Sequence, residues 1–304
     1  MSFASTVREE LSRVPWECED CKVAELSALI RIDGNLSANY RLEIATETAS
    51  VARRVVSLIH ELYGLKTEIT TRRSVLHKSY NYLIMVPAQI GLKEALDNLG
   101  IITERGLDLG IDPKLVKKDC CKVAYLRGAF IGGGFIADPN GDSHLEMTTP
   151  HEELATALVD LMVELGIPAK VTRRRNTFVI YLKGADLIVE FLGRTGAHNA
   201  VLNMESIRVT KSVRNDVNRR LNAEVANQAK TINAAMDQVD AIRQLVDTYG
   251  IESLSPALQE LALLRLANPE ASLRELGELA NPPLSKSAVY HRIRRIEAMA
   301  RELE

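Results

Sequence analysis

The chain repeats itself after one hundred residues, and this repeat limits the fold more than any other feature. Residues 21–34 read CKVAELSALIRIDG and residues 121–134 read CKVAYLRGAFIGGG, with the same four residues at the start and the same glycine at the end. Between them, the small Ala28 matches the small Gly128. The period is far too long for the repeating unit of a solenoid. We therefore expect two copies of one half-domain, fused in a single chain.

The similarity continues past the glycine, so both copies should have the same order of elements. Each copy reads as a buried helix, a hairpin, an amphipathic helix, two strands and a last helix. In the first copy we expect the helix 21–34, the hairpin 35–38 and 40–46, the helix 48–62, the strands 66–72 and 80–86, and the helix 92–99. In the second copy the matching elements are 123–131, 135–137, 143–149, 152–165, 169–175, 177–183 and 185–193. The order αββαββα, present twice, predicts a duplicated α+β domain with pseudo-twofold symmetry.

Beyond residue 196 the strand patterns end, and an all-helical region is expected. Apolar residues at three-, four- and seven-residue steps indicate one long helix, or two, over 207–249. Three shorter helices should follow, the first over 256–266. Ser272 and Glu275 form a capping box for the second, in which Leu273, Leu276 and Leu279 should face the core.

The third of these helices, 286–302, has the pattern of the recognition helix in a helix-turn-helix motif. Ser285 is its expected cap, and its inner side should carry Val289, Ile293, Ile296 and Ala300. In such motifs this helix lies in the major groove and reads base edges. The residues expected to contact DNA are Ser285, Lys286, Ser287, Tyr290, His291, Arg292, Arg294 and Arg295. The alternative is a basic helix that packs against the repeats.

Charge supports a nucleic-acid partner only through local patches, because the formal net charge of the chain is −2. Two basic runs lie outside the last helix, and we expect them to contact the DNA backbone: Lys170, Arg173, Arg174 and Arg175, then Lys211, Arg214 and Arg219. A single run of this kind is usually a solvated face. Three runs, one of them inside a helix-turn-helix pattern, favour double-stranded DNA. No stretch has the length of a membrane span or the pattern of a signal peptide, so we expect a cytoplasmic protein without a membrane partner.

Four cysteines occur as Cys18-x-x-Cys21 and Cys120-Cys121, and two interpretations of them remain open. The repeat could bring both pairs to the starts of two facing helices, where they would bind zinc or form a disulfide. Adjacent cysteines are poor spacing for two tetrahedral ligands, and only Cys21 and Cys121 correspond in the repeat. We favour buried thiols and expect neither a metal nor another cofactor.

Residues 26–34, LSALIRIDG, resemble the LAGLIDADG motif of homing endonucleases, and residues 126–134, LRGAFIGGG, resemble it more weakly. The resemblance implies two helices packed face to face through small residues, each ending in an acid that holds a metal ion against DNA. Asp33 stands at the first acid position, but Gly133 stands at the second. Because one carboxylate cannot hold paired metal ions, we expect no nuclease activity and a vestigial metal position at Asp33. Asp138 and Asp142 lie beyond the helix end.

The whole chain resembles the WhiA family of bacterial regulators, in which a degenerate LAGLIDADG-like domain precedes a helix-turn-helix. The matching segments are 218–227 (NRRLNAEVAN), 273–280 (LRELGELA), 282–283 (PP) and 284–296 (LSKSAVYHRIRRI). The resemblance implies a non-enzymatic, nucleoid-associated regulator of transcription in sporulation, cell division and chromosome segregation, with a WhiB-like second regulator as a partner. The alternatives are a residual metal-dependent DNA endonuclease and a protein-interaction scaffold at promoters. The expected domains are 1–20 (helix and link), 21–110 and 111–197 (repeats), 198–250 (helical linker) and 251–304 (helix-turn-helix).

Overall fold

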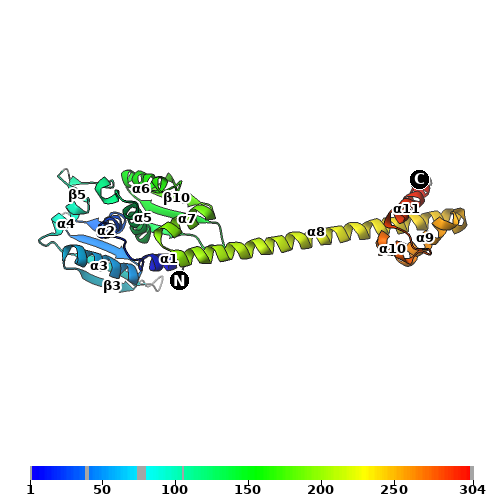
Figure 1. Ribbon diagram of the computed structural model, residues 1–304, viewed down its shortest axis with the longest axis horizontal. Helices are drawn as coiled ribbons and strands as arrows, with labels where there is room; N and C mark the ends of the chain where they lie inside the picture. Colours follow the sequence, from blue (N-terminus) through cyan, green and yellow to red (C-terminus); the bar gives the residue numbers. More distant parts are fainter. Residues whose placement is uncertain (1, 38–40, 74–79, 105, 302–304) are drawn as a thin grey trace. The chain divides into compact units, whose positions relative to one another are not determined.

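The computed structural model describes residues 2–37, 41–73, 80–104 and 106–301, which form two compact units (Figure 1). The first unit extends to Thr210 and the second begins at Lys211, and each has its own apolar core. Helix α8 (His198–Tyr249) contributes its first turns to the first unit, where Ala200 and Met204 are buried, and its remainder to the second. It is a single helix that begins before residue 207. No helix in the described part of the chain has the length and apolarity needed to cross a membrane.

The first unit contains helix α1 (Phe3–Leu11) and then two copies of the predicted element order. The first copy consists of α2 (Glu19–Asp33), β1 (Gly34–Leu36), β2 (Leu42–Thr46), α3 (Ala49–Tyr63), β3 (Glu68–Arg73), β4 (Tyr80–Val86) and α4 (Leu92–Asn98). The second consists of α5 (Asp119–Gly133), β7 (Gly134–Ile136), β8 (His144–Thr149), α6 (Glu152–Glu164), β9 (Lys170–Arg174), β10 (Thr177–Lys183) and α7 (Ala185–Thr195). The order αββαββα is thereby confirmed; of the expected first hairpin, residues 38 and 40 lie outside the described residues.

The connection between the copies holds three short elements that the sequence did not predict. They are β5 (Ile102–Thr103), β6 (Gly106–Leu107) and a 3-10 helix (Pro113–Val116). Strands of two residues are too short to show an alternation of apolar and polar residues, so a sequence pattern could not predict them.

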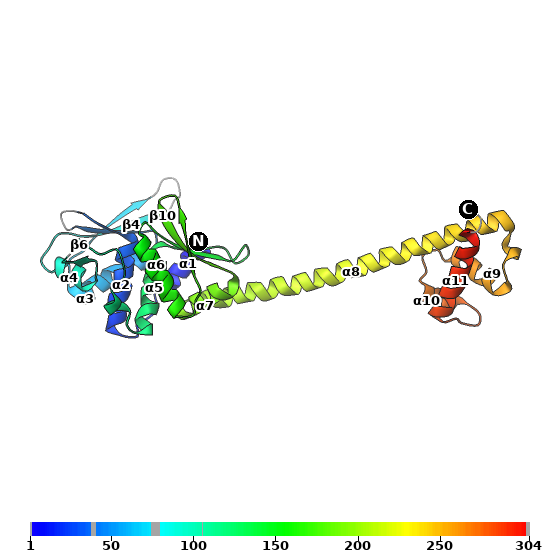
Figure 2. The same cartoon turned by 90° about the horizontal axis from the view of Figure 1, so that it is seen from above.

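Each copy forms a four-stranded antiparallel sheet, and the two sheets share strand order and register. The orders are β1-β2-β4-β3 and β7-β8-β10-β9. Equivalent pairs are Leu42–Val86 with Leu145–Leu182, and Gly34–Ile44 with Gly134–Met147. Figure 2 shows β4 and β10 on one side of this unit and α2 and α5 on the other. Equal register in both sheets confirms the predicted duplication.

Helices α2 and α5 pack against each other through residues that correspond in the repeat. At their starts, Sγ of Cys21 lies 3.8 Å from Sγ of Cys121. Further along, a Cβ added to Gly128 would lie 2.5 Å from the carbonyl oxygen of Glu25 and 3.0 Å from Cβ of Ala28. Contact between a residue and its own counterpart, such as Ala28 with Gly128, is what a pseudo-twofold axis requires. Glycine is needed here because a side chain would force the two backbones apart.

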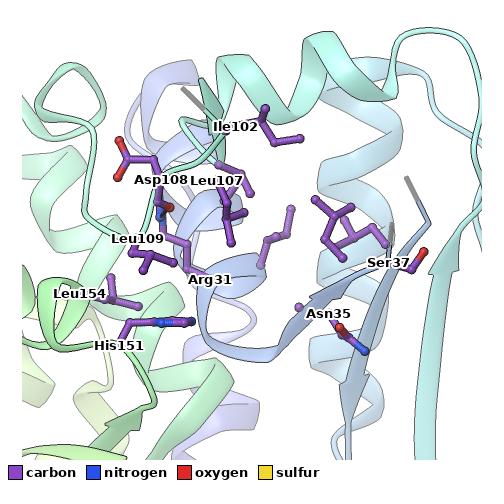
Figure 3. Close-up of a pocket in the computed structure, with 15 residues that line it drawn as sticks. Arg31, Asn35, Ser37, Ile102, Leu107, Asp108, Leu109, His151 and Leu154 are labelled. Carbon is purple, nitrogen blue, oxygen red and sulfur yellow. Dashed lines mark hydrogen bonds between the residues drawn. The ribbon is translucent and has the colours of Figure 1, made fainter. Parts of the chain in front are cut away.

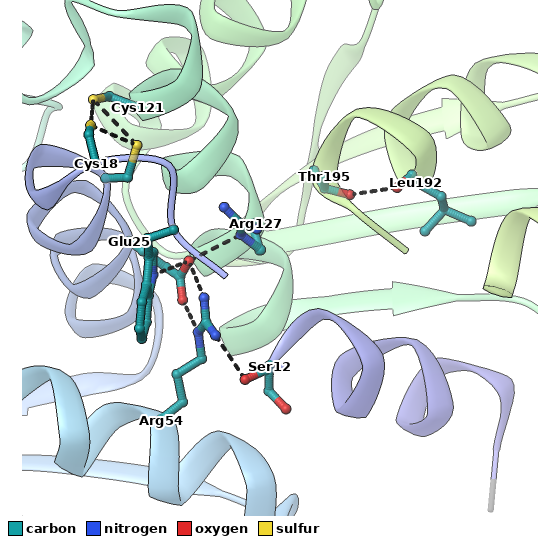
Figure 4. A network of polar contacts seen from close by, with 10 residues as sticks. Ser12, Cys18, Glu25, Arg54, Cys121, Arg127, Leu192 and Thr195 are labelled. Carbon is teal, nitrogen blue, oxygen red and sulfur yellow. Dashed lines mark hydrogen bonds and ion pairs between the residues drawn. The ribbon is translucent and has the colours of Figure 1, made fainter. Parts of the chain in front are cut away.

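A buried charged network fixes this helix pair to its surroundings (Figure 4). Glu25 is fully buried, and its Oε2 accepts hydrogen bonds from Trp16 Nε1 at 3.0 Å and from Arg54 Nη2 at 2.9 Å. Arg127 Nε of α5 forms an ion pair with the same oxygen at 3.1 Å. Arg54 also donates from Nη1 to the carbonyl oxygen of Ser12 at 2.9 Å. Burial lowers the pKa of Arg127 and the nearby Glu25 carboxylate raises it, so the guanidinium depends on that carboxylate.

The second unit packs α9 (Pro256–Ala267), α10 (Leu273–Leu279) and α11 (Lys286–Arg301) with the end of α8 and a 3-10 helix (Ile251–Ser253). The predicted capping box is present: Glu275 N–H donates to Ser272 Oγ at 3.3 Å, and Ser272 N–H donates to Glu275 Oε2 at 2.7 Å. Leu276 is buried, but the prediction for Leu279 is wrong, because its side chain is 53% exposed. At about 100° per residue, Leu279 lies roughly 120° away from Leu273 around the helix. Glu302, the expected last residue of α11, lies outside the described residues.

The substitution Glu25→Gln should destabilise the first unit by about 3–5 kcal/mol, because two buried guanidinium groups would lose their counter-charge. Unfolding in urea, followed by the fluorescence of Trp16, measures this unit, since Trp16 is the single tryptophan of the chain. The control is Glu19→Gln, which removes an exposed ion pair with Lys22 and should cost less than about 1 kcal/mol. Equal unfolding midpoints for the two variants would contradict a supporting role for the network.

Candidate nucleic-acid interface

The outward side of α11 is defined by its cap and by its apolar inner side. Ser285 Oγ accepts a hydrogen bond from the N–H of Ala288 at 3.2 Å, which fixes the first turn. The four residues predicted for the inner side are all buried: Val289, Ile293, Ile296 and Ala300. This orientation leaves six of the predicted contact residues exposed along the outside of the helix: Lys286, Ser287, Tyr290, His291, Arg294 and Arg295. We call these six residues, together with the exposed Ser285, the α11 face.

The position of α11 depends on a glycine in α10. A Cβ added to Gly277 would lie 2.2 Å from the carbonyl oxygen of Leu284, and the Leu284 N–H donates to the Gly277 carbonyl oxygen at 2.8 Å. The turn between α10 and α11 therefore lies directly on the backbone of α10. With its inner side packed on α9 and α10, the helix presents the α11 face away from the core of its own unit.

Two of the predicted contact residues make bonds within the second unit. Arg292 is half-buried, and its Nη1 donates to the carbonyl oxygen of Ala257 in α9 at 3.4 Å. Arg294 Nη1 pairs with Glu297 at 3.2 Å, beside a hollow that Asp237 and Asp240 of α8 also line. The first two turns, which hold Ser285 to His291, therefore form the centre of the α11 face. This agrees with the way recognition helices use their N-terminal residues.

The sheet of the second copy does not gather the run Lys170, Arg173, Arg174 and Arg175 into one patch. Strand alternation places Lys170 and Arg174 on the side of the sheet that faces away from the apolar core, which we call the outer side. Arg173 lies on the opposite side, with its guanidinium 5.8 Å from the ring centre of Phe178. Arg175 occupies the following turn, with φ 53°. Arg174 Nη1 is 2.8 Å from Glu146 Oε1, so an acid partly neutralises the outer side.

The shared register identifies a basic residue that the sequence reasoning missed. Arg72 pairs with Asn81 across β3 and β4 as Arg174 pairs with Thr177 across β9 and β10, so Arg72 and Arg174 hold equivalent places. The signal was a basic strand-like segment at the same point of both copies. In the same register, Glu68 of the first sheet stands where Lys170 stands in the second, so the two outer sides differ in charge.

The second predicted run lies on α8. Lys211, Arg214 and Arg219 are exposed, and all three belong to the second unit. Arg219 forms an ion pair with Asp216 one turn earlier. These residues therefore share a unit with the α11 face, unlike those of the sheet.

Asp33 and Gly133 end the two central helices, and their surroundings do not fit a pair of metal ions. A Cβ added to Gly133 would lie 2.6 Å from Cγ2 of Ile32, so that position is filled by an apolar side chain. Arg8 Nε donates to the carbonyl oxygen of Gly134 at 3.2 Å, which brings a cation to the same end of the helix pair. Burial raises the pKa of Asp33 to about 6, against the opposite effect of the Arg8 guanidinium. Asp138 Oδ1 accepts the N–H of Asn140 at 2.8 Å within its own turn.

A hollow of about 480 Å³ lies beside the end of α2 (Figure 3). Arg31 is on its wall, but this side chain is committed to the backbone: Nη1 donates to the carbonyl oxygen of Asp108 at 2.5 Å and Nη2 to that of Gly100 at 2.6 Å. Much of the remaining wall is apolar, with Leu36, Leu42, Leu107 and Leu154. Arg31 therefore ties the connection between the copies to α2.

The raised pKa of Asp33 predicts a pH-dependent effect of Asp33→Asn. A carboxyl whose pKa is higher in the folded than in the unfolded state contributes stability at low pH that is lost as the pH rises through about 6. The variant cannot ionise, so relative to the wild type it should gain roughly 1–3 kcal/mol between pH 4 and pH 7.5. Urea unfolding at the two pH values, monitored by Trp16 fluorescence, measures this gain. A constant difference between the two proteins would contradict the raised pKa.

Three family models match the chain in succession. The WhiA N-terminal LAGLIDADG-like domain matches residues 19–102, the WhiA LAGLIDADG-like domain matches residues 122–214, and the WhiA C-terminal HTH domain matches residues 217–300. The matches follow the order of the two copies and the helical unit described above.

Relatives and solved structures agree with these matches. The probable cell division protein WhiA of Desulforamulus reducens is 45% identical over 314 residues, which cover 100% of this chain and 96% of the relative. That of Heliobacterium modesticaldum is 44% identical and covers 99% and 96%. The crystal structure of full-length DUF199/WhiA from Thermotoga maritima is 27% identical, with a TM-score of 0.63 and 99% coverage of both chains. The chain described here belongs to the WhiA family.

Proposed function

We propose that this protein is a sequence-specific regulator of transcription that reads promoter DNA with the α11 face. The observation that carries the proposal is a capped helix whose apolar side is buried and whose opposite side presents polar and basic residues from Ser285 to Arg295. Base edges in the major groove are read by side chains of these types, with arginine and lysine preferring guanine. The names of the relatives support a role in cell division. Roles in sporulation and chromosome segregation, and a place in the cytoplasm at the nucleoid, follow from the family resemblance.

The phosphate contacts, in this proposal, come chiefly from α8. Lys211, Arg214 and Arg219 are exposed and lie in the same unit as the α11 face. Contacts of this kind set affinity and its salt dependence, whereas base contacts set the choice of site. On the sheets, Glu146 offsets Arg174 and Glu43 pairs with Arg41 at 2.8 Å, so a strong field for phosphate is not expected there.

The repeat unit is proposed to be a non-enzymatic relative of a nuclease domain. Its central helices offer one acid, Asp33, where paired metal ions need carboxylates on both sides, and Ile32 crowds the place of the second. The exposed side of its sheets carries charges of both signs, which suits a protein partner better than a phosphate backbone. A second regulator at the same promoter, of the WhiB-like kind that the family resemblance implies, would bind there.

Lys286→Ala should weaken binding to the preferred DNA site by about 1–3 kcal/mol, because Lys286 lies in the first turn of α11. The matched control is Arg301→Ala, which removes one exposed positive charge from the last turn of the same helix and should cost less than about 0.5 kcal/mol. Fluorescence anisotropy with a site selected from a random pool, and with random DNA, measures both effects. Equal losses for the two variants would contradict reading by the start of α11.

Arg214→Ala and Arg174→Ala should differ in their effect on salt dependence. Each substitution removes one positive charge, from α8 and from the outer side of a sheet respectively. If α8 contacts phosphates, Arg214→Ala makes the negative slope of log K against log salt less steep by about 1, and Arg174→Ala leaves the slope unchanged. Binding isotherms at several salt concentrations give the slope. The reverse result would place the DNA backbone on the sheets.

A further inference from the structure

The four cysteines of the chain form two pairs that are far apart in sequence, and all four meet at the starts of α2 and α5. Figure 4 shows Cys18 beside Cys121 at this point. Their four Sγ atoms all lie within 4.8 Å of one another. Sγ of Cys18 is 3.2 Å from that of Cys21 and 3.9 Å from those of both Cys120 and Cys121. Cys21 and Cys121 face each other at 3.8 Å. Among the residues that the structure describes, no other group of three or more metal-ligating side chains comes together.

Three of these separations fit a single tetrahedral metal ion. With a zinc–sulfur distance of about 2.3 Å, the four sulfurs of a tetrahedral site lie about 3.8 Å apart. The Cys18–Cys120, Cys18–Cys121 and Cys21–Cys121 separations match this value within about 0.1 Å. The Cys18–Cys21 separation of 3.2 Å is shorter, yet far longer than the bond of about 2.05 Å in a disulfide.

The position of Cys18 removes the objection that adjacent cysteines are poor ligands. Cys18 caps α2 in an extended conformation, with φ −153° and ψ 168°, and reaches both Cys120 and Cys121. Cys18 from the link, Cys21 from the first copy, and Cys120 and Cys121 from the second copy therefore supply the site, although Cys18 and Cys120 do not correspond in the repeat. Two of the sulfurs are buried and two are half-buried, as expected for a site closed to solvent on one side.

The electrostatic surroundings favour thiolates as soon as a cation is present. The starts of two helices, whose N–H groups favour negative charge, meet at the sulfurs. Nearby, the Glu25 network carries two guanidinium groups, those of Arg54 and Arg127, against one carboxylate.

We propose that Cys18, Cys21, Cys120 and Cys121 bind one Zn²⁺ ion in a structural site that fastens the start of α2 to the start of α5. Zn²⁺ displaces one proton from each of the four thiols, and the resulting centre has a net charge of −2. Thiolates select soft ions such as Zn²⁺, and four sulfur atoms within 4.8 Å of one another have room for a single ion between them. All four positions are filled by protein, so the ion holds the two copies together and activates no water.

The test uses the full-length protein, purified without chelator, with Zn²⁺ and Co²⁺ as the probes. Elemental analysis should find one zinc per chain, and replacement by Co²⁺ should give the absorption of a tetrahedral cobalt–thiolate centre. Removal of the ion by a chelator should lower the unfolding midpoint reported by Trp16 fluorescence. Wild-type protein that holds no zinc and shows four free thiols, a Cys18–Cys21 disulfide, or iron in place of zinc would each overturn the proposal.

Two single substitutions identify the ligands. Cys120→Ser and Cys18→Ser should each abolish stoichiometric zinc. Both residues are half-buried, whereas Cys21 and Cys121 are buried, so these two substitutions disturb the packing of the core least. The matched control is Val123→Ala, a half-buried position one turn further along α5, which should keep one zinc per chain. A folded Cys120→Ser protein with full zinc and an unchanged cobalt spectrum would contradict the four-cysteine site. The wild-type zinc content decides the proposal even if a variant does not fold.

Discussion

The close approach of α2 and α5 is the contact on which the first unit depends. At Gly128 the two backbones come so near that any side chain would meet the carbonyl oxygen of Glu25. The strands β1 and β7 begin directly after these helices, at Gly34 and Gly134, so the helix contact also sets where each sheet starts. Small residues at the crossing keep the distance short, and the rest of the unit is built outward from it.

Two largely apolar helices in close contact leave few places for polar side chains, and each buried polar side chain there needs defined partners. Glu25 is the clearest case, since its carboxylate meets groups from the N-terminal link, from α3 and from α5. A buried ion pair of this kind adds little stability compared with apolar packing, but it penalises any arrangement in which a partner is missing. The network thus selects one placement of α1, α3 and α5 around α2.

The two ends of the helix pair have opposite chemical character. At the start, four sulfur atoms surround a space that suits a soft cation. At the other end, Ile32 and the Arg8 guanidinium occupy the surroundings of Asp33 and Gly133. In the described part of the chain, the one group of side chains that could hold a metal ion is therefore at the end of the helix pair far from Asp33. The exposed basic residues proposed to contact DNA lie in the second unit, on α8 and α11.

The sequence by itself determined the duplication, the order αββαββα, the capping box at Ser272 and the buried side of α11. Each of these rests on local periodicity or on a comparison of two segments, both of which can be read without coordinates. The sequence also showed that no acid stands at the position that matches Asp33, because that position is Gly133. Even the basic strands of both copies were visible, although Arg72 was not singled out.

Only the tertiary structure decided which residues meet. It brought Cys18 to Cys120, which the repeat does not relate, and it buried Glu25 among two arginines. It turned Arg173 toward Phe178 and left Leu279 exposed, where a pattern over a few residues suggested otherwise. These outcomes depend on contacts between segments far apart in the chain, or on which side of an element its neighbours cover. A sequence pattern reports the period of an element, whereas the partner of each side chain is set by packing.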